Sequence, residues 1–355
     1  MKKPLHSKKG DYMGDFHGLH HSTVLVTGAT GMIGSRTVRR LLEENRKADA
    51  GITVVAHFRD AAKRDRVFAD VLDDPAIRWL QADICRPLEC PVPVHYIVHG
   101  AGVTGGSRKH VDFPVRTIQT ALQGTTNLLE RARGHAVRGV VYLSSLEVYG
   151  KTDFSLPAIR ETDGGYIDPT AVRSSYSESK RMCETLCAGY AKQYGVPAKI
   201  VRLAPTYGLG ADYGDNRVLC EFARCILEKR DIVLRSTGET VRNYCDVDDA
   251  AEAILLVLVR GAVGEAYNIA NPATAISVRD LAERFIALHP GSGAALKFDV
   301  SEDAAKLGYN KTIQIRLDSQ KLEALGWAPR YGIDELIGHL MDAMAASAAA
   351  RGKGE

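Results

Sequence analysis

The sequence lacks the features that would direct a chain into a membrane or out of the cell. No stretch of its 355 residues approaches about eighteen uninterrupted apolar side chains, which argues against a transmembrane helix. Its opening residues include lysines but no apolar segment after them, so we expect no signal peptide. The seven cysteines form no Cys-x-x-Cys pair, which favours reduced thiols and argues against a zinc site. We therefore expect a cytoplasmic protein that has no membrane partner and no bound metal.

A strong charge of either sign is also missing. The formal net charge is +3, and the basic residues are spread along the chain without interleaved aromatics. This pattern argues against a nucleic-acid partner and leaves small anions as candidate ligands. The first 21 residues are expected to form a flexible leader, in which His17, His20 and His21 are solvated.

A glycine-rich turn lies near the start of the chain. The apolar run Thr23-Val-Leu-Val26 leads into Gly28, Gly31 and Gly34, and a helical pattern follows. Glycines at this spacing allow a sharp turn and a close approach to a pyrophosphate, and the start of the helix attracts the negative charge. The arrangement predicts a dinucleotide-binding turn.

Strands and helices alternate after this turn. Helices are expected at about 112–133 and 173–194, between apolar strands predicted at residues 52–55, 77–80, 96–98, 140–143 and 199–203. Alternation of this kind predicts an α/β protein with a Rossmann-type doubly wound parallel sheet that binds ligands at the carboxyl ends of its strands.

The alternation also suggests domain boundaries. We expect the dinucleotide-binding domain to comprise residues 22–205 and a returning helix within about 246–264. Residues 206–245 and 265–340 are expected to form a smaller C-terminal substrate-binding lobe, and residues 341–355 a frayed tail.

Tyr176 and Lys180 lie one helical turn apart downstream of the glycine turn. Residues at i and i+4 share a helix face, so the ammonium can sit close to the phenol and also reach a cofactor ribose. A free tyrosine ionises near pH 10, and a nearby cation favours its phenolate. The pair therefore predicts a proton-transfer site.

A series of motifs covers residues 22–340 in one order. They are Gly28-x-x-Gly31-x-x-Gly34, Asp83-Ile84, His99-Gly-Ala-Gly102, Ser144-Ser-Leu-Glu-Val-Tyr-Gly150, Tyr176-x-x-x-Lys180, Arg202-Leu-Ala-Pro-Thr-Tyr-Gly208, Arg242-Asn-Tyr-Cys-Asp-Val-Asp-Asp249, Tyr267-Asn-Ile269 and Leu325-Gly-Trp327. Together they resemble the extended short-chain dehydrogenase/reductase family, specifically its nucleotide-sugar epimerase and dehydratase branch.

The resemblance implies a catalytic set. Ser145 aligns with the Ser or Thr that hydrogen-bonds the sugar hydroxyl being oxidised, with Ser144 as the alternative. Tyr176, held as phenolate by Lys180 and the nicotinamide ring, would take the hydroxyl proton as hydride leaves for the cofactor.

Glu147 occupies a position that differs in role among similar enzymes. In sugar 4,6-dehydratases a Glu here removes a proton, and an Asp before it protonates the departing hydroxyl. Leu146 stands in place of that Asp and cannot donate a proton, which disfavours ordinary 4,6-dehydration. Glu147 is therefore either a catalytic base or, as we favour, a structural hydrogen-bonding residue.

The resemblance favours bound NAD, although NADP stays open. The position of the acidic residue that would accept from the ribose 2′-OH is assigned to His57, and the basic Arg59 follows it. Arg59 could either stack on adenine or bind a 2′-phosphate. The expected cofactor contacts come from the glycine turn, the ends of the next strands and the Tyr–Lys helix: Gly28, Thr30, Gly31, Met32, Ile33, Gly34, Arg59, Asp83, Ile84, Ala101, Gly102, Tyr176 and Lys180.

The expected substrate is a nucleotide-diphosphate sugar. The resemblance pairs Arg242 with the diphosphate, and places Ser145 at the sugar. Asn216 and Arg217 open a helix and either meet the same diphosphate or simply begin that helix. Pro205 replaces an Asn common among relatives, so the orientation of the ligand is expected to differ.

The leading hypothesis is an epimerase that forms a transient 4-keto sugar and returns hydride to its other face. The alternatives are a dehydratase or decarboxylase that uses Glu147, an NADPH-dependent ketoreductase, and a redox-sensing binding protein. By resemblance, the helices near 112–133 and 173–194 are expected to form a homodimer interface.

Overall fold

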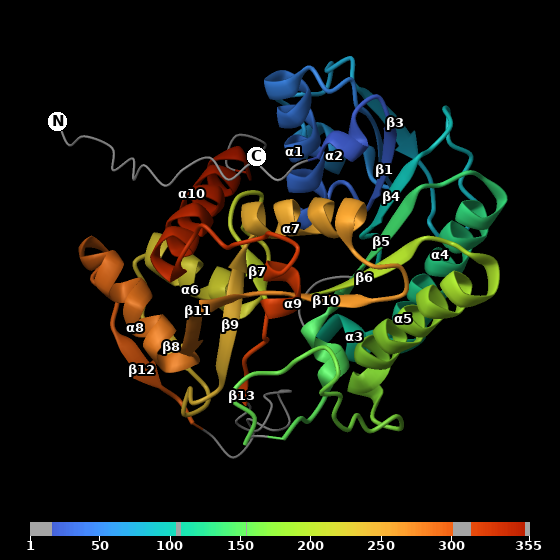
Figure 1. Cartoon of the computed structure of the whole chain (residues 1–355). Helices are drawn as coiled ribbons and strands as arrows, with labels where there is room; N and C mark the ends of the chain where they lie inside the picture. The colour runs from blue at the N-terminus through green and yellow to red at the C-terminus, as the bar shows by residue number, and fades with distance from the viewer. Residues whose placement is uncertain (1–15, 104–107, 154, 301–313, 352–355) are drawn as a thin grey trace.

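A parallel sheet of seven strands organises the part of the chain that the structure describes. The structure, a computed structural model, describes residues 16–103, 108–153, 155–300 and 314–351. The strand order is β10-β6-β5-β4-β1-β2-β3. Figure 1 shows this sheet between the helices that flank it. The strands are β1 (Thr23–Thr27), β2 (Thr53–Phe58), β3 (Ile77–Gln81), β4 (Tyr96–His99), β5 (Gly139–Ser145), β6 (Ala198–Leu203) and β10 (Ala266–Ile269). The order reverses between β1 and β4, which confirms the doubly wound α/β fold that the sequence predicts.

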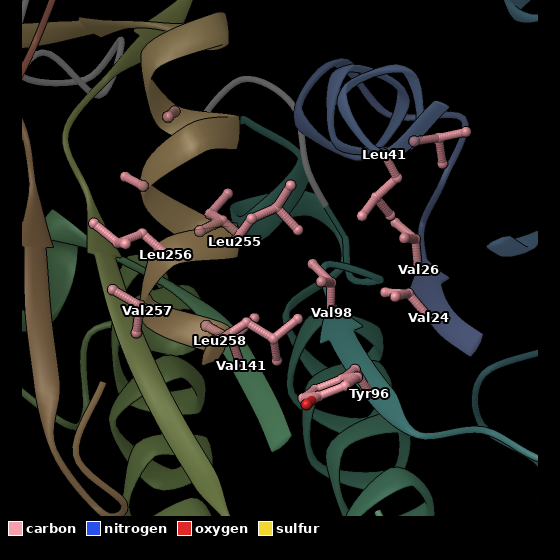
Figure 2. Close-up of a cluster of buried hydrophobic side chains, with 14 of the residues drawn as sticks. Val24, Val26, Leu41, Tyr96, Val98, Val141, Leu255, Leu256, Val257 and Leu258 are labelled. Carbon is pink, nitrogen blue, oxygen red and sulfur yellow. The ribbon is translucent and has the colours of Figure 1, made fainter. Parts of the chain in front are cut away.

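Helices cover both faces of this sheet. Side chains alternate along each strand, so Val24 and Val26 face α1 (Met32–Ala48) and α7 (Val247–Arg260), whereas Leu25 faces the side of α4 (Pro114–Gly134) and α5 (Ser175–Tyr194). Figure 2 shows the first of these cores, with Leu255 to Leu258 of α7 packed toward the strands. Helix α7 is apolar around most of its circumference because it lies between the sheet and a second region.

The second region contains shorter sheets and three helices around a separate core. Its helices are α6 (Val218–Leu227), α8 (Val278–Leu288) and α10 (Ile333–Arg351). Its strands are β7 (Thr206–Tyr207), β9 (Val241–Asp246), β11 (Asn271–Ser277), β13 (Gln314–Ile315), and the parallel pair β8 (Ile232–Leu234) and β12 (Leu296–Phe298). We call this region the lobe.

The remaining elements are short. They are η1 (His17–Leu19), α2 (Ala61–Val67), α3 (Arg108–Asp112), η2 (Leu146–Tyr149), η3 (Val172–Ser174), η4 (Pro290–Ser292) and α9 (Gln320–Glu323). Among the described residues, none of the helices is both long and apolar enough to cross a membrane.

Two expectations, about the bounds of the lobe and about the C-terminal tail, differ from the structure. Strand β10 pairs with β6 in the large sheet, although the sequence placed residues 265–340 wholly in the lobe, and Trp327 also packs in the sheet's core. Helix α10 continues to Arg351 and buries Met344, so the tail does not fray from residue 341. The apolar pattern of this helix keeps it packed on the lobe.

The expected leader is also ordered in part. Phe16 and Leu19 are buried beneath α1 and α7, and Tyr96 donates a hydrogen bond to the Gly18 carbonyl at 2.9 Å. Two apolar side chains therefore anchor residues 16–21 to the sheet. Residues 1–15 of the leader lie outside the described residues.

Candidate active site

The glycine turn between β1 and α1 allows close contact between backbone segments. Gly28 has φ of +69°, and a Cβ there would lie 2.9 Å from the backbone of Ala101. A Cβ on Gly34 would lie 2.3 Å from the Gly28 carbonyl oxygen. Gly31 is the N-cap of α1 and supplies no side-chain acceptor, so the first backbone amides of α1 are left for another acceptor. Thr30, Met32 and Ile33 are half-buried along this turn.

The end of β2 differs from the expectation for His57. Its ring is buried, with Nε2 3.1 Å from the Ala82 carbonyl oxygen and Nδ1 3.4 Å from the Gly28 amide nitrogen. Burial lowers the pKa of His57, so the ring is a neutral connector between β2, β3 and the glycine turn. The sequence did not reveal this structural role.

Arg59 and Asp83 lie beside each other at the edge of the sheet. Both are exposed, and a hydrogen bond from the Cys85 amide, helped by the charge of Arg59, lowers the pKa of Asp83. Ile84 is buried against α4, where a Cβ on Gly124 would lie 3.0 Å from its Cγ1. Its side chain therefore belongs to the core, and Asp83 offers the polar group at this edge.

One pocket brings the expected catalytic helix to the glycine loop after β4. Its lining includes Ala101, Gly102, Tyr176 and Lys180. The Lys180 Nζ atom lies 5.8 Å from the centre of the Tyr176 ring and donates to the Leu143 carbonyl at 2.6 Å. Two pairs of residues that are distant from each other in the sequence therefore meet at the carboxyl ends of β4 and β5, where a doubly wound sheet binds ligands.

Burial controls the protonation of this pair. Burial and the charge of Glu147 raise the pKa of Tyr176 to about 12, while a hydrogen bond with Ser145 opposes the shift. Burial also lowers the pKa of Lys180 to about 8. The sequence predicted that Lys180 and the nicotinamide ring together would hold a phenolate, and the pKa of Tyr176 shows that the protein groups by themselves favour the phenol.

The geometry distinguishes the two candidate serines. Ser145 is half-buried at the end of β5, accepts a hydrogen bond from the Glu147 amide at 3.2 Å, and is hydrogen-bonded to Tyr176. Ser144 is buried on the other face of the strand. This favours Ser145 as the serine that meets a substrate hydroxyl.

Glu147 is held by two residues that the sequence analysis did not identify. Its carboxylate oxygens lie 3.0 and 2.9 Å from Nη2 of Arg173, and Ser177 donates to it at 3.2 Å. Burial alone would raise the pKa of Glu147, but Arg173, Arg242 and Ser177 lower it below its usual value. The spacing of Arg173 and Ser177, four residues apart and flanking Tyr176, could have indicated them.

The expected substrate residues approach the site from the lobe. Arg242 of β9 is close enough to Glu147 to lower its pKa, and its buried Nε has no hydrogen-bond acceptor among the described residues. Arg217 caps α6, lies over the Tyr207 ring at 4.4 Å and pairs with Asp215 at 2.8 Å. Asn216 is exposed beside it. An unsatisfied guanidinium nitrogen is costly unless a ligand accepts from it.

Comparison with known proteins identifies the family. Residues 24–270 match the NAD dependent epimerase/dehydratase family. The chain belongs to this family. UDP-glucuronic acid decarboxylase 6 of Arabidopsis thaliana is 30% identical over 88% of this chain and 85% of its own length. A dTDP-glucose 4,6-dehydratase of Streptomyces antibioticus is 29% identical over 90% of this chain and 91% of its own length.

Solved structures of the epimerase/dehydratase family share the fold. UDP-glucose 4-epimerase of Thermotoga maritima gives a TM-score of 0.77 at 22% identity, over 92% of this chain and 99% of that one. A dTDP-glucose 4,6-dehydratase of Streptomyces venezuelae, solved with NAD bound, gives 0.76 at 25% identity, over 92% and 98%. These relatives perform different reactions, so membership establishes an NAD-dependent epimerase/dehydratase scaffold and leaves the individual reaction to the site itself.

Proposed function

We propose that this protein is a nucleotide-sugar epimerase that acts through a transient 4-keto sugar with bound NAD. The observation that carries the proposal is the meeting of Tyr176 and Lys180 with the Ala101–Gly102 loop at one pocket, with Ser145 hydrogen-bonded to Tyr176. These groups suffice to hold a sugar alcohol and to move its proton beside a dinucleotide.

The residues around the glycine turn fit NAD. The positive φ at Gly28 and the lack of space at Gly34 support a backbone cradle, and the uncapped start of α1 supplies amides for a pyrophosphate. The proposed cofactor contacts are the residues expected from the sequence, except that the side chain of Ile84 makes no contact. Asp83 supplies the polar group at that edge. When bound, NAD supplies a reversible hydride acceptor and a positive ring. NADP stays the alternative because Arg59 is exposed at this edge.

Tyr176 is proposed as the group that takes and returns the proton of the sugar hydroxyl. Ser145 orients that hydroxyl, since its Oγ is already hydrogen-bonded to the phenol. Lys180 holds an ammonium within 5.8 Å of the ring and, with its pKa at about 8, can both donate and regain a proton near neutrality. The oxidised sugar then carries a ketone, and return of hydride to its other face inverts the carbon.

The surroundings of Glu147 support epimerisation over dehydration. Its carboxylate is occupied by Arg173 and Ser177, and its lowered pKa makes it a weak base. Leu146, buried beside it, has no proton to give to a departing hydroxyl. Epimerisation needs neither group as an acid or a base.

The substrate is proposed to be anchored by its diphosphate. Arg242 presents a buried Nε for which residues 16–103, 108–153, 155–300 and 314–351 provide no acceptor. Arg217 and Asn216 lie at the start of α6, where backbone amides favour an anion. A guanidinium can bind two phosphate oxygens together, which an ammonium cannot do as well.

A decarboxylase is the second candidate. The 30% identity to a UDP-glucuronic acid decarboxylase supports it, as do Arg173 and Arg242 near the expected sugar site, where they could pair with a sugar carboxylate. After oxidation at C4, the C5–C6 bond would break, carbon dioxide would leave, C5 would gain a proton, and hydride would return to C4. This route also needs no acid at Leu146.

Product analysis separates the two reactions. The purified protein is first denatured and its released dinucleotide identified by mass. The protein is then incubated with UDP-glucose, dTDP-glucose and UDP-glucuronic acid, and the products are followed by proton NMR and mass spectrometry. An epimerase gives a product of unchanged mass, whereas a decarboxylase loses carbon dioxide from the uronate alone. Stoichiometric consumption of added NADPH would instead indicate a reductase.

A homodimer through α4 and α5 is also proposed. These helices expose Val115, Ile118 and Met182, with 62, 36 and 51% of each residue accessible. Burial of such side chains against a second copy would stabilise a dimer. Gel filtration of the wild type and of Val115→Glu tests this, and a monomeric wild type at micromolar concentration would contradict it.

A further inference from the structure

His110 makes contacts that the proposed reaction does not yet use. It lies on α3, is 4% exposed, and its imidazole stacks on the ring of Tyr176 with centroids 4.5 Å apart and planes 29° apart. A buried offset stack of this kind fixes the plane of both rings. The sequence analysis did not identify His110, because α3 and α5 are more than sixty residues apart in the chain.

The orientation of the imidazole is itself determined. Its Nδ1 lies 3.3 Å from Oγ1 of Thr117, and that hydroxyl donates its hydrogen to the Phe113 carbonyl at 3.0 Å. The hydroxyl has only one hydrogen, so Nδ1 of His110 is the donor in this contact. The ring can therefore not turn about its own axis without losing a hydrogen bond.

A second contact joins the backbone of His110 to the catalytic helix. Ser175, which directly precedes Tyr176, donates from Oγ to the His110 carbonyl at 3.0 Å, and this contact is buried. His110 thus contacts two consecutive residues of α5. Its carbonyl accepts from Ser175, and its ring stacks on Tyr176. Helix α3 also packs on α4, α5 and η3.

We propose that His110 is a positioning residue that sets the plane of the Tyr176 phenol and shields one face of it from water. This inference rests on the proposed function for its catalytic consequence. The imidazole is an uncharged ring that covers one face of the phenol. Burial lowers its pKa, as do the charges of Arg173, Lys109 and Lys180, while Glu147 opposes them. It therefore adds no charge to the site near neutral pH.

The test compares His110→Ala with His110→Phe, which restores a flat ring but not the hydrogen bond to Thr117. In His110→Ala, water reaches the phenol, so the pKa of Tyr176 falls from about 12 toward its ordinary value of 10. Turnover falls about tenfold to a hundredfold, the expected consequence of misplacing a catalytic group by about 1 Å. His110→Phe keeps the pKa of Tyr176 and the turnover near those of the wild type.

The phenol is titrated by its tyrosinate absorbance, as the difference between each protein and its Tyr176→Phe counterpart. The exposed His135, the C-cap residue of α4, supplies the control variant His135→Ala, which leaves both readouts unchanged. Ser175→Ala removes the second contact alone and carries the test if His110→Ala does not fold; it is expected to lower turnover.

Four results would overturn the proposal. They are His110→Ala behaving like the wild type, His110→Phe falling as far as His110→Ala, Ser175→Ala retaining full turnover, and an unchanged phenol titration across the series. The titration does not depend on turnover. A wild-type protein that converts no nucleotide sugar would therefore refute the proposed function without deciding the role of His110.

Discussion

The two sides of the proposed site are built in different ways. The proposed cofactor side consists mainly of backbone, from a glycine turn and the loop after β4, together with the side chains of two residues of α5 at the carboxyl edge of the sheet. The lobe side consists of charged side chains on β9 and before α6. The buried Nε of Arg242 has no acceptor in the part of the chain that the structure describes, and Arg217 is already paired with Asp215. Backbone geometry follows from the fold, whereas side-chain geometry depends on what binds.

This difference explains why the family includes several reactions. The cofactor side can be inherited unchanged, because any change at Gly28 or Gly34 would force backbone atoms apart. The lobe side can accept new substrates through single substitutions. Variants on the two sides should therefore have different defects. Variants on the cofactor side should lose turnover or bound cofactor, and variants on the lobe side should lose affinity for the substrate.

The largest effect is expected from Tyr176→Phe. Removal of the phenol oxygen eliminates the proposed proton acceptor, so kcat should fall by about a thousandfold or more, within the range for general acid–base groups. Bound dinucleotide should be retained, because the glycine turn is untouched. Turnover and cofactor content are measured on the same preparation.

The control for this variant lies on the same helix. Tyr194→Phe alters an exposed ring at the end of α5 and should leave kcat unchanged. Activity of Tyr176→Phe close to that of the wild type would remove the phenol from the base role and refute the proposed mechanism.

Gly34→Ala tests the cofactor side directly. Its new Cβ would lie 2.3 Å from the Gly28 carbonyl, so the turn must shift, at a cost of about 1–3 kcal/mol in the free energy of unfolding. Dinucleotide should be lost from the purified protein. Chemical denaturation and mass analysis of the released cofactor measure the two effects.

Gly338→Ala is the matched comparison, since a Cβ at this position of α10 meets no atom within 4 Å. The free energy of unfolding should be unchanged or rise by about 0.5–1 kcal/mol, because alanine loses less backbone entropy than glycine. Equal cofactor content in the two variants would contradict the importance of the turn.

Arg242→Leu tests the lobe side. Loss of a charged hydrogen bond costs about 1.5–3 kcal/mol, so KM for the nucleotide sugar should rise about tenfold to a hundredfold while bound NAD stays in place. Arg279→Lys, at an arginine that lies over the Phe298 ring, serves as the control. A change in kcat alone would indicate that Arg242 acts on the sugar rather than on the diphosphate.

Much of the cofactor side could be predicted from the sequence because it depends on local patterns. The spacing of Gly28 and Gly34, the strand before them and the Tyr176–Lys180 interval each specify backbone geometry without knowledge of distant contacts. The predicted strands and helices accordingly lie within a few residues of those observed.

Long-range contacts were missed for a physical reason. Three contacts at the site depend on tertiary packing. His110 stacks on Tyr176, Arg173 pairs with Glu147, and the His57 ring lies beside the Ala82 carbonyl. The same holds for Phe16, whose burial is decided by α1 and α7. Neither residue type nor periodicity in the sequence specifies which distant element will supply the partner.

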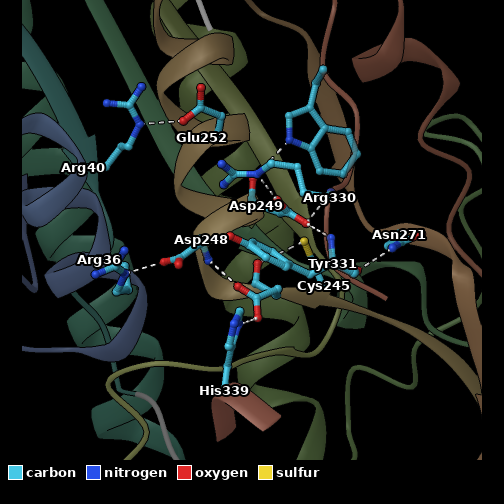
Figure 3. A network of polar contacts seen from close by, with 12 residues as sticks. Arg36, Arg40, Cys245, Asp248, Asp249, Glu252, Asn271, Arg330, Tyr331 and His339 are labelled. Carbon is cyan, nitrogen blue, oxygen red and sulfur yellow. Dashed lines mark hydrogen bonds and ion pairs between the residues drawn. The ribbon is translucent and has the colours of Figure 1, made fainter. Parts of the chain in front are cut away.

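The smallest expected effect concerns the junction between the two regions. His339 of α10 contacts Asp246, the N-cap residue of α7, with Nδ1 2.8 Å from Oδ2. Figure 3 shows the His339 side chain at this junction. Arg36 of α1 pairs with Asp248 at the start of α7 on the other side. A network of side chains thus connects α10 of the lobe to the helices that cover the sheet.

Protonation of His339 should strengthen this junction. The hydrogen bond to Asp246 raises the pKa of His339, burial opposes it, and the charges of Asp246, Asp248 and Asp342 add to the increase. The folded-state pKa is above the unfolded value of 6.5, so the stabilisation is complete below pH 6.5 and is lost as pH rises through the folded value. A partly exposed pair of this kind contributes about 1 kcal/mol or less.

Thermal unfolding across this pH range measures the contribution. The difference in unfolding temperature between the wild type and His339→Asn should be largest below pH 6.5 and should shrink at higher pH. A difference in unfolding temperature that grew as pH rose would mean that neutral His339 is the stabilising form. The contribution of His339 to the junction would then come from packing of its ring against Tyr331 rather than from its charge.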